Sequence, residues 1–168
     1  MTGRSRSVLI VGLGNADRAD DGIGPLVAEK LRRLLPAGTA LASPRTDPIA
    51  LIAEWQGFDA AICIDAASLV SKPGRIHRFD LSMAELPSDR QPVSDHVLSF
   101  AATVRLARVL HQAPQRIIIY AVEGASFAAG APMTPEVAVQ APLVAAQVAA
   151  EVETLRHFSF RHAAANSP

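Results

Sequence analysis

Asp21, Asp65 and His96 are the residues of this 168-residue chain whose types and positions could together bind a divalent metal ion. Asp21 lies in the segment Asp20-Asp21-Gly22-Ile23-Gly24, which follows an apolar run and a glycine-rich turn. Asp65 ends a second apolar run, and His96 follows a polar loop that contains prolines. Two carboxylates and one imidazole suit a borderline ion such as zinc or nickel. Three protein ligands would also leave coordination positions open for water or substrate, as catalysis requires.

The glycine-rich turn before Asp21, Gly12-Leu13-Gly14-Asn15, first suggests a dinucleotide-binding loop. The fingerprint of such loops requires a third small residue where this chain has Asp17. The acidic residues of the segment would also place negative charge where a pyrophosphate binds. The turn therefore favours a cation site, and a small-molecule binder on the same fold is the weaker alternative.

Each candidate residue also has a simpler interpretation. Asp21 and its neighbour Asp20 could stabilise the positive end of the following helix, and Asp65 could be a turn residue. His96 could be a solvated residue in the first turn of a helix, although that position also keeps an imidazole neutral and able to bind a metal. Glu123, at the end of another strand, could line the site or be solvated in a loop. From the residues alone, both kinds of interpretation stay open.

Strand-like and helix-like stretches alternate along the chain and would bring these residues to one edge of a sheet. We predict strands at residues 7–12, 38–43, 58–65 and 116–122, and an edge strand at 74–81. Helices are predicted at 22–35, from about 47, at 94–111 and from 134, with Ser94 and Thr134 as N-caps and Pro48 and Pro135 in first turns. The pattern indicates an α/β fold, a single three-layer domain with a mainly parallel twisted sheet between helices. Ligands bind such sheets at the carboxyl ends of the strands.

Composition narrows the class of protein. Sixteen Lys and Arg residues balance sixteen Asp and Glu residues, so no bulk charge points to nucleic acid or to a membrane surface. No apolar run reaches spanning length and the amino terminus lacks a signal-peptide core, so we expect a cytoplasmic protein. The single cysteine, Cys63, excludes an internal disulfide and is expected in the core. We expect one domain over residues 1–156 and a C-terminal tail, poorly ordered, over 157–168.

Taken together, these residues resemble the maturation endopeptidases of nickel–iron hydrogenases. The resemblance covers about residues 7–155 and rests on the glycine-rich turn with its aspartates, on Ile64-Asp65-Ala66, on Ser94-x-His96 and on Thr134-Pro135. It implies an endopeptidase that removes the C-terminal extension of a hydrogenase large-subunit precursor after nickel insertion. It gives Asp21, Asp65 and His96 metal-contacting and catalytic roles. Nickel would arrive with the precursor, zinc or cadmium could replace it in a crystal, and we expect a monomer.

One segment departs from the family pattern. Relatives commonly have an acidic-Gly-Gly-Thr turn where this chain has Ser43-Pro44-Arg45-Thr46, and many have glutamate in place of Asp21. Because that turn lies beside the site in the family, the resemblance leaves open a difference in substrate recognition here. The departure keeps open a non-catalytic alternative, a checkpoint or chaperone that senses the metal state of the same precursor. The general base is not assigned, with Asp20 and Asp65 as candidates.

Overall fold

The computed structural model describes residues 7–42, 47, 49–82 and 95–157. Within them, five strands form one sheet in the order β2-β1-β3-β5-β4. The strands are β1 (Val8–Gly12), β2 (Thr39–Leu41), β3 (Ala60–Ala67), β4 (Ile76–Asp80) and β5 (Arg116–Glu123). Neighbouring strands are parallel except for β4, which pairs with β5 in the antiparallel direction. The predicted sheet, including its edge strand, is confirmed.

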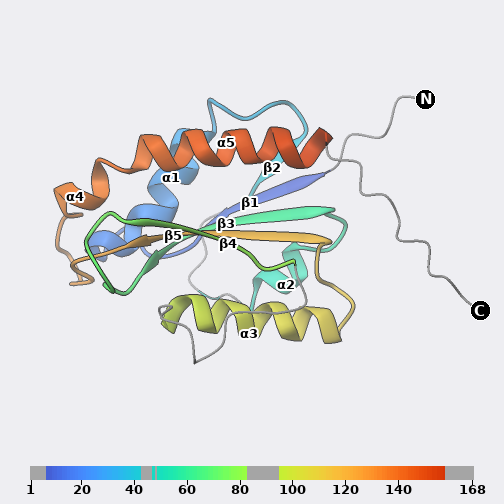
Figure 1. Ribbon diagram of the computed structural model, residues 1–168, viewed down its shortest axis with the longest axis horizontal. Coiled ribbons are helices and arrows are strands. Elements are labelled where there is room, and N and C mark those ends of the chain that lie inside the picture. Colours follow the sequence, from blue (N-terminus) through green and yellow to red (C-terminus); the bar gives the residue numbers. More distant parts are fainter. Residues whose placement is uncertain (1–6, 43–46, 48, 83–94, 158–168) are drawn as a thin grey trace, which may run out of the picture.

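Helices cover both faces of this sheet. They are the 3-10 helix η1 (Ala19–Gly22) and the α-helices α1 (Ile23–Leu31), α2 (Leu51–Glu54), α3 (Asp95–Val109), α4 (Pro135–Ala138) and α5 (Ala141–His157). Figure 1 shows α1 and α5 on one face and α2 and α3 on the other, which confirms the three-layer arrangement. None of the helices in the described ranges is long and apolar enough to cross a membrane.

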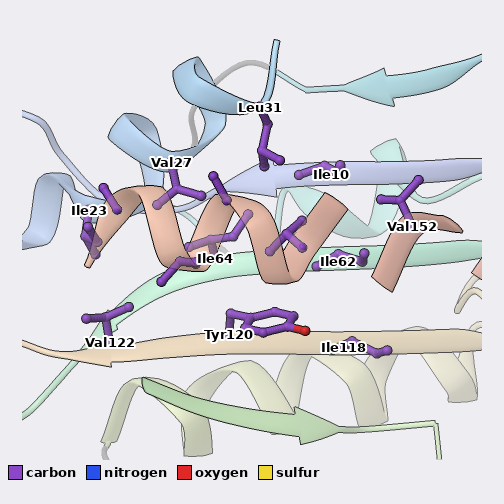
Figure 2. Close-up of a cluster of buried hydrophobic side chains, with 14 of the residues drawn as sticks. Ile10, Ile23, Val27, Leu31, Ile62, Ile64, Ile118, Tyr120, Val122 and Val152 are labelled. Carbon is purple, nitrogen blue, oxygen red and sulfur yellow. The ribbon is translucent and has the colours of Figure 1, made fainter. Parts of the chain in front are cut away.

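The core consists of two apolar layers, one on each face of the sheet. Successive side chains of a strand point to opposite faces, so each buried strand contributes to both layers. The layer beneath α1 and α5 is drawn in Figure 2, where Ile10, Ile62, Ile64, Ile118 and Val122 of the strands meet Val27 and Val152 of the helices. The opposite layer joins Leu9, Val11, Cys63, Ile117 and Ile119 to Phe100 and Val104 of α3. Both layers hold the strand ends in fixed positions.

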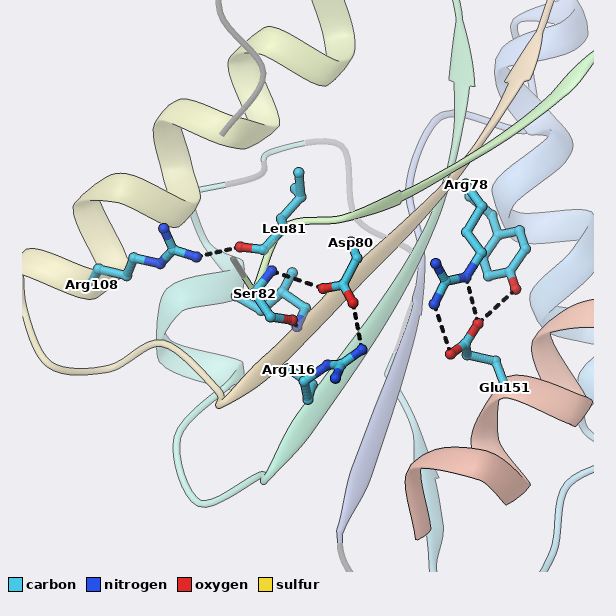
Figure 3. Close-up of polar contacts among 9 residues, drawn as sticks. Arg78, Asp80, Leu81, Ser82, Arg108, Arg116 and Glu151 are labelled. Carbon is cyan, nitrogen blue, oxygen red and sulfur yellow. Dashed lines mark hydrogen bonds and ion pairs between the residues drawn. The ribbon is translucent and has the colours of Figure 1, made fainter. Parts of the chain in front are cut away.

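Polar contacts fasten the edge strand β4 to helix α5 and to its neighbour β5 (Figure 3). Arg78 donates two hydrogen bonds to Glu151 of α5, at 2.6 and 2.9 Å, and the hydroxyl of Tyr120 donates to the same carboxylate at 3.1 Å. Asp80 forms an ion pair with Arg116 of the neighbouring strand. Charged residues of this kind also discourage an exposed edge from pairing with another chain.

Two predicted helices have different bounds in the structure. The helix predicted at 22–35 ends at Leu31, because the chain tightens into a turn in which the N–H of Leu34 donates to the carbonyl of Leu31 at 2.8 Å. The helix predicted from about residue 47 begins at Leu51. The Asp47 carboxylate accepts the N–H of Ile49 at 2.9 Å, and such a turn delays the start of the helix.

The helix predicted from residue 134 is two helices, α4 and α5. Thr134 occupies the N-cap position and Pro135 the first turn, as predicted, but the Thr134 hydroxyl makes no capping bond and donates instead to Asp20. Helix α5 continues through His157, one residue into the predicted tail. Residues 158–168, the loop 83–93, Ser94 and Pro48 lie outside the described residues, so the predictions for them stay predictions.

Candidate active site

Asp21 is positioned by the glycine-rich turn that follows β1. Gly14 has a φ of +109°, and a Cβ atom there would lie 2.0 Å from the carbonyl oxygen of Asp21. Only glycine fits this conformation and this close approach. The next residue, Asn15, donates its N–H to the Oδ2 atom of Asp21 at 2.8 Å. The turn therefore packs directly on Asp21 and fixes its half-buried carboxylate.

Asp65 lies within β3, two residues before the end of the strand and not at its end as predicted. Its side chain is 7% exposed, and it accepts the N–H of Ala66 at 2.8 Å. The preceding residue, Ile64, pairs with Gly12 and accepts the N–H of Leu13 at 2.7 Å. Helix η1 packs against β3 as well. The structure therefore brings the Asp21 and Asp65 segments together at the carboxyl edge of the sheet, as the sequence predicts.

His96 is the second residue of α3. Figure 1 shows the N-terminal end of α3 at the end of the sheet where the chain passes from β1 to α1. The His96 side chain lies outside the described residues. Among the side chains that the structure does describe, no group of three or more His, Cys, Asp or Glu residues could hold a metal ion. The three-ligand set thus stays a prediction.

Asp20 is a structural anchor and not a candidate base. Its side chain is fully buried, and its carboxylate accepts hydrogen bonds from residues 125–134. Burial alone would raise the pKa of Asp20, but the hydrogen bonds from Thr134, Ser126 and Ala125 outweigh burial and lower it. A carboxylate with its lone pairs occupied in this way cannot reach substrate, which removes Asp20 from the two candidates for the general base.

Glu123 neither lines an open site nor lies in solvent. Its carboxylate is fully buried and accepts the N–H groups of Val70, Ser71 and Lys72 at 2.7–3.0 Å. The His77 ring lies 2.7 Å from its other oxygen. Burial would raise the pKa of Glu123, but the bonds from Ser71, His77 and Val70 hold it at about 2. Glu123 therefore fixes the loop that follows β3.

Cys63 has the core position that its sequence context predicts. It is fully buried in β3, and burial, together with the nearby charge of Asp65, raises the pKa of its thiol. A thiol in this state is a poor nucleophile, because only the thiolate attacks. His157, at the end of α5, is exposed and pairs with Glu153, so it is a surface residue.

Sequence reasoning missed the partners of Asp20 in the loop 125–134. These partners are mainly backbone N–H groups of Ala125, Ser126 and Thr134, and a backbone donor leaves no mark in the side-chain sequence. The one available signal was the Thr134 hydroxyl, which the sequence assigns equally well to a helix cap. A buried aspartate at 0% exposure was also not expected beside a solvent-accessible one.

Comparison with known sequences gives one family. The hydrogenase maturation protease family profile matches residues 25–151, which include Asp65 and His96 and begin just after Asp21. A curated relative, the hydrogenase expression/formation protein HupM of Azotobacter chroococcum mcd 1, is 31% identical over 129 residues. That alignment covers 74% of this chain and 61% of the relative, so the chain spans less than two thirds of the relative's length.

Solved structures share the fold. The hydrogenase maturating endopeptidase HybD of E. coli superimposes with a TM-score of 0.73 at 23% identity, over 88% of this chain and 92% of that chain. The [NiFe] hydrogenase maturation protease HycI of Thermococcus kodakarensis KOD1 gives a TM-score of 0.70 at 20% identity, over 90% and 95% of the two chains. At these identities the likeness establishes the fold alone.

Proposed function

The chain belongs to the hydrogenase maturation protease family, and from this premise we propose that it is a metal-dependent endopeptidase. Its substrate would be the precursor of a nickel–iron hydrogenase large subunit, from which it removes the C-terminal extension after nickel insertion. The observation that carries the proposal is the pair of carboxylates, Asp21 and Asp65, on adjoining elements at the carboxyl edge of the sheet. Ligand sites of α/β sheets lie at this edge.

The donor set suits nickel that is bound to the precursor, which is part of the substrate and not a resident cofactor. We assign metal contacts and catalytic roles to Asp21, Asp65 and His96. The Asp21 carboxylate is half-buried, and one of its oxygens is oriented by the N–H of Asn15. Carboxylate oxygens and an imidazole nitrogen are suitable ligands for a borderline divalent ion. Such an oriented carboxylate reduces the reorganisation that binding requires.

The chain's own residues would hold the precursor's metal-bearing segment against the edge of the sheet. When bound, the metal would polarise the scissile carbonyl and lower the pKa of a water. Asp65 is the remaining candidate for the general base, since Asp20 is occupied by hydrogen bonds. We propose that Asp65 either contacts the metal or accepts the proton of the attacking water. Monomeric state and cytoplasmic location stay predictions of the sequence analysis.

Cleavage of purified nickel-loaded precursor tests the proposal. Mutation of a residue that only hydrogen-bonds to a metal ligand typically lowers metal affinity or activity by about 10–100-fold. Asp21→Asn and His96→Ala would each remove a direct metal contact, so we expect each to slow cleavage by about 100-fold or more. The matched controls are Asp17→Asn, an exposed aspartate of the same loop, and His157→Ala, an exposed histidine. Wild-type rates in Asp21→Asn and His96→Ala would exclude the assigned roles.

The non-catalytic alternative rests on the segment Ser43-Pro44-Arg45-Thr46, which replaces the family's acidic turn and lies outside the described residues. A checkpoint or chaperone would bind the nickel-loaded precursor and leave its length unchanged. Mass spectrometry of the precursor, with and without this protein, separates the two functions. Loss of the C-terminal extension supports the endopeptidase, and an intact precursor in a stable complex supports the checkpoint.

A further inference from the structure

The two adjacent aspartates of η1 have different surroundings. Asp20 is 0% exposed, whereas Asp21 is half-buried. A 3-10 helix has about three residues per turn, so successive side chains point about 120° apart. One carboxylate of the pair therefore points toward the loop 125–134, and the next points toward Asn15 and the edge of the sheet.

The Asp20 carboxylate gathers the loop 125–134 around itself. Oδ2 accepts the N–H groups of Ala125 at 2.7 Å and Ser126 at 3.0 Å, and Oδ1 accepts the N–H of Thr134 at 2.7 Å. The Thr134 hydroxyl lies 3.0 Å from both oxygens. A Cβ on Gly124 would come within 3.0 Å of the Asp20 Cβ, so the loop closes tightly over this side chain. Bonds to an ionised acceptor are stronger than neutral ones, and this group therefore holds the loop firmly.

The backbone that leads into Asp20 is strained. Ala19 has a φ of +47°, a left-handed conformation that costs a residue with a Cβ roughly 1–2 kcal/mol. The same loop stabilises this conformation, because the Ala19 N–H donates to Ala131 at 3.2 Å and the Asp20 N–H donates to Ser126 at 3.0 Å. Strain of this kind persists only where surrounding contacts determine the backbone. The Asp20 contacts hold this strained backbone in place, and Asp20 directly precedes Asp21 in the chain.

We propose that Asp20 is a positioning residue for Asp21: its buried carboxylate fixes the strained η1 turn on the loop 125–134 and thereby sets where the Asp21 carboxylate lies. The backbone of Asp21 is then confined between this anchor and Gly14, which packs against its carbonyl oxygen. The side chain itself has one described bond, from Asn15. The expected effect of Asp20 on cleavage rests on the proposed function, whereas its effect on the position of Asp21 does not.

Asp20→Asn tests this role. The amide keeps the size of the side chain, but its NH2 group replaces an oxygen that accepts backbone N–H groups, so a donor then faces a donor. Misplacement of a reacting group by about 1 Å costs on the order of 100-fold, so we expect kcat for nickel-loaded precursor to fall about 10–100-fold per folded molecule, with KM little changed. Glu123→Gln is the matched control, since Glu123 is equally buried and holds three N–H groups of a different loop. We expect Glu123→Gln to lose stability and keep the wild-type kcat.

Amide hydrogen exchange gives a second readout that does not depend on cleavage. The Asn15 N–H is protected by Asp21 Oδ2, so it should exchange faster in Asp20→Asn and at the wild-type rate in Glu123→Gln. Thr134→Val, which removes the hydroxyl and keeps the N–H, should give a smaller change in the same direction and serves if Asp20→Asn does not fold.

Three outcomes separate the possibilities. Wild-type kcat and wild-type Asn15 protection in Asp20→Asn and Thr134→Val would overturn the positioning role. An equal fall of kcat and of Asn15 protection in Glu123→Gln would overturn it too, since the effect would then follow stability alone. If the wild-type protein leaves the precursor intact, the proposed function fails, and the exchange of the Asn15 N–H still decides whether Asp20 positions Asp21.

Discussion

Replacing Glu123 by glutamine should remove a buried charge on which the loop after β3 depends. The carboxylate accepts the N–H of Ser71 at 2.7 Å and those of Val70 and Lys72 at 3.0 Å. The Ser71 hydroxyl and the His77 ring contact the other oxygen, at 3.1 and 2.7 Å. A glutamine keeps one oxygen for the three N–H groups but carries no charge, so each of these bonds becomes weaker.

The pKa of Glu123 gives the magnitude of this effect. The hydrogen bonds hold the pKa at about 2, below the ordinary 4.5, although burial alone would raise it. One pKa unit corresponds to about 1.4 kcal/mol, so the ionised form contributes roughly 3 kcal/mol to the free energy of unfolding. Because the folded-state pKa lies below the unfolded one, this contribution is complete above about pH 4.5 and is lost as the pH falls toward 2.

Urea unfolding of the wild type and Glu123→Gln, from neutral pH to about pH 3, measures the difference directly. We expect a gap of roughly 3 kcal/mol at neutral pH that narrows below about pH 4.5, since glutamine has no proton to gain. Glu29→Gln is the control, because Glu29 forms an exposed pair with Arg32 that should contribute less than about 1 kcal/mol. A gap that stays constant with pH, or one no larger than that of the control, would refute the reasoning.

Two further predictions concern Gly14, which packs on Asp21, and Tyr120 of β5. Gly14→Ala should cost about 2 kcal/mol or more in chemical denaturation and abolish precursor cleavage, because its Cβ would meet the carbonyl of Asp21. Gly130→Ala, also at positive φ but in open space, is the comparison, and an equal loss in both would attribute the cost to φ alone. The single tyrosine, Tyr120, should titrate at about pH 12 in its near-ultraviolet absorbance, because burial and the Glu151 carboxylate raise its pKa. In Glu151→Gln the titration should move toward 10, and an unchanged midpoint would contradict the assigned cause.

The sequence predicted the fold well because its strands are marked by composition. Apolar runs such as Val8–Gly12 and Ile117–Val122 have the branched residues and the length of strands buried on both faces, and the structure buries them on both faces. Helix bounds were less certain. The end of α1 depends on a local turn at Leu34 and the start of α2 on the side chain of Asp47, and neither changes the hydrophobic period from which a helix is predicted.

The sequence predicts where the candidate site lies, but it does not predict that Asp20 is a buried anchor while Asp21 belongs to the site. Strand order and the rule for carboxyl ends bring Asp21 and Asp65 to one edge, and no further information is needed for that step. The separation of Asp20 from Asp21 depends on N–H groups 105 to 114 residues further along the chain. Backbone donors are present at every residue except proline, so a sequence does not show which of them a carboxylate will meet.

The position of Asp65 inside β3 bears on how the site would recognise a metal. The backbone of Asp65 pairs with Ala121 of β5, and the pairing of the two strands continues beyond it to Ala67. Asp21 is held in a comparable way by a turn that glycine closes and a buried aspartate anchors. Two of the three proposed contacts therefore lie on elements whose geometry is set before any substrate binds. In the function proposed above, such a site would distinguish a nickel-loaded precursor from an empty one through the metal that the precursor brings, because the two carboxylates would need little rearrangement to receive it.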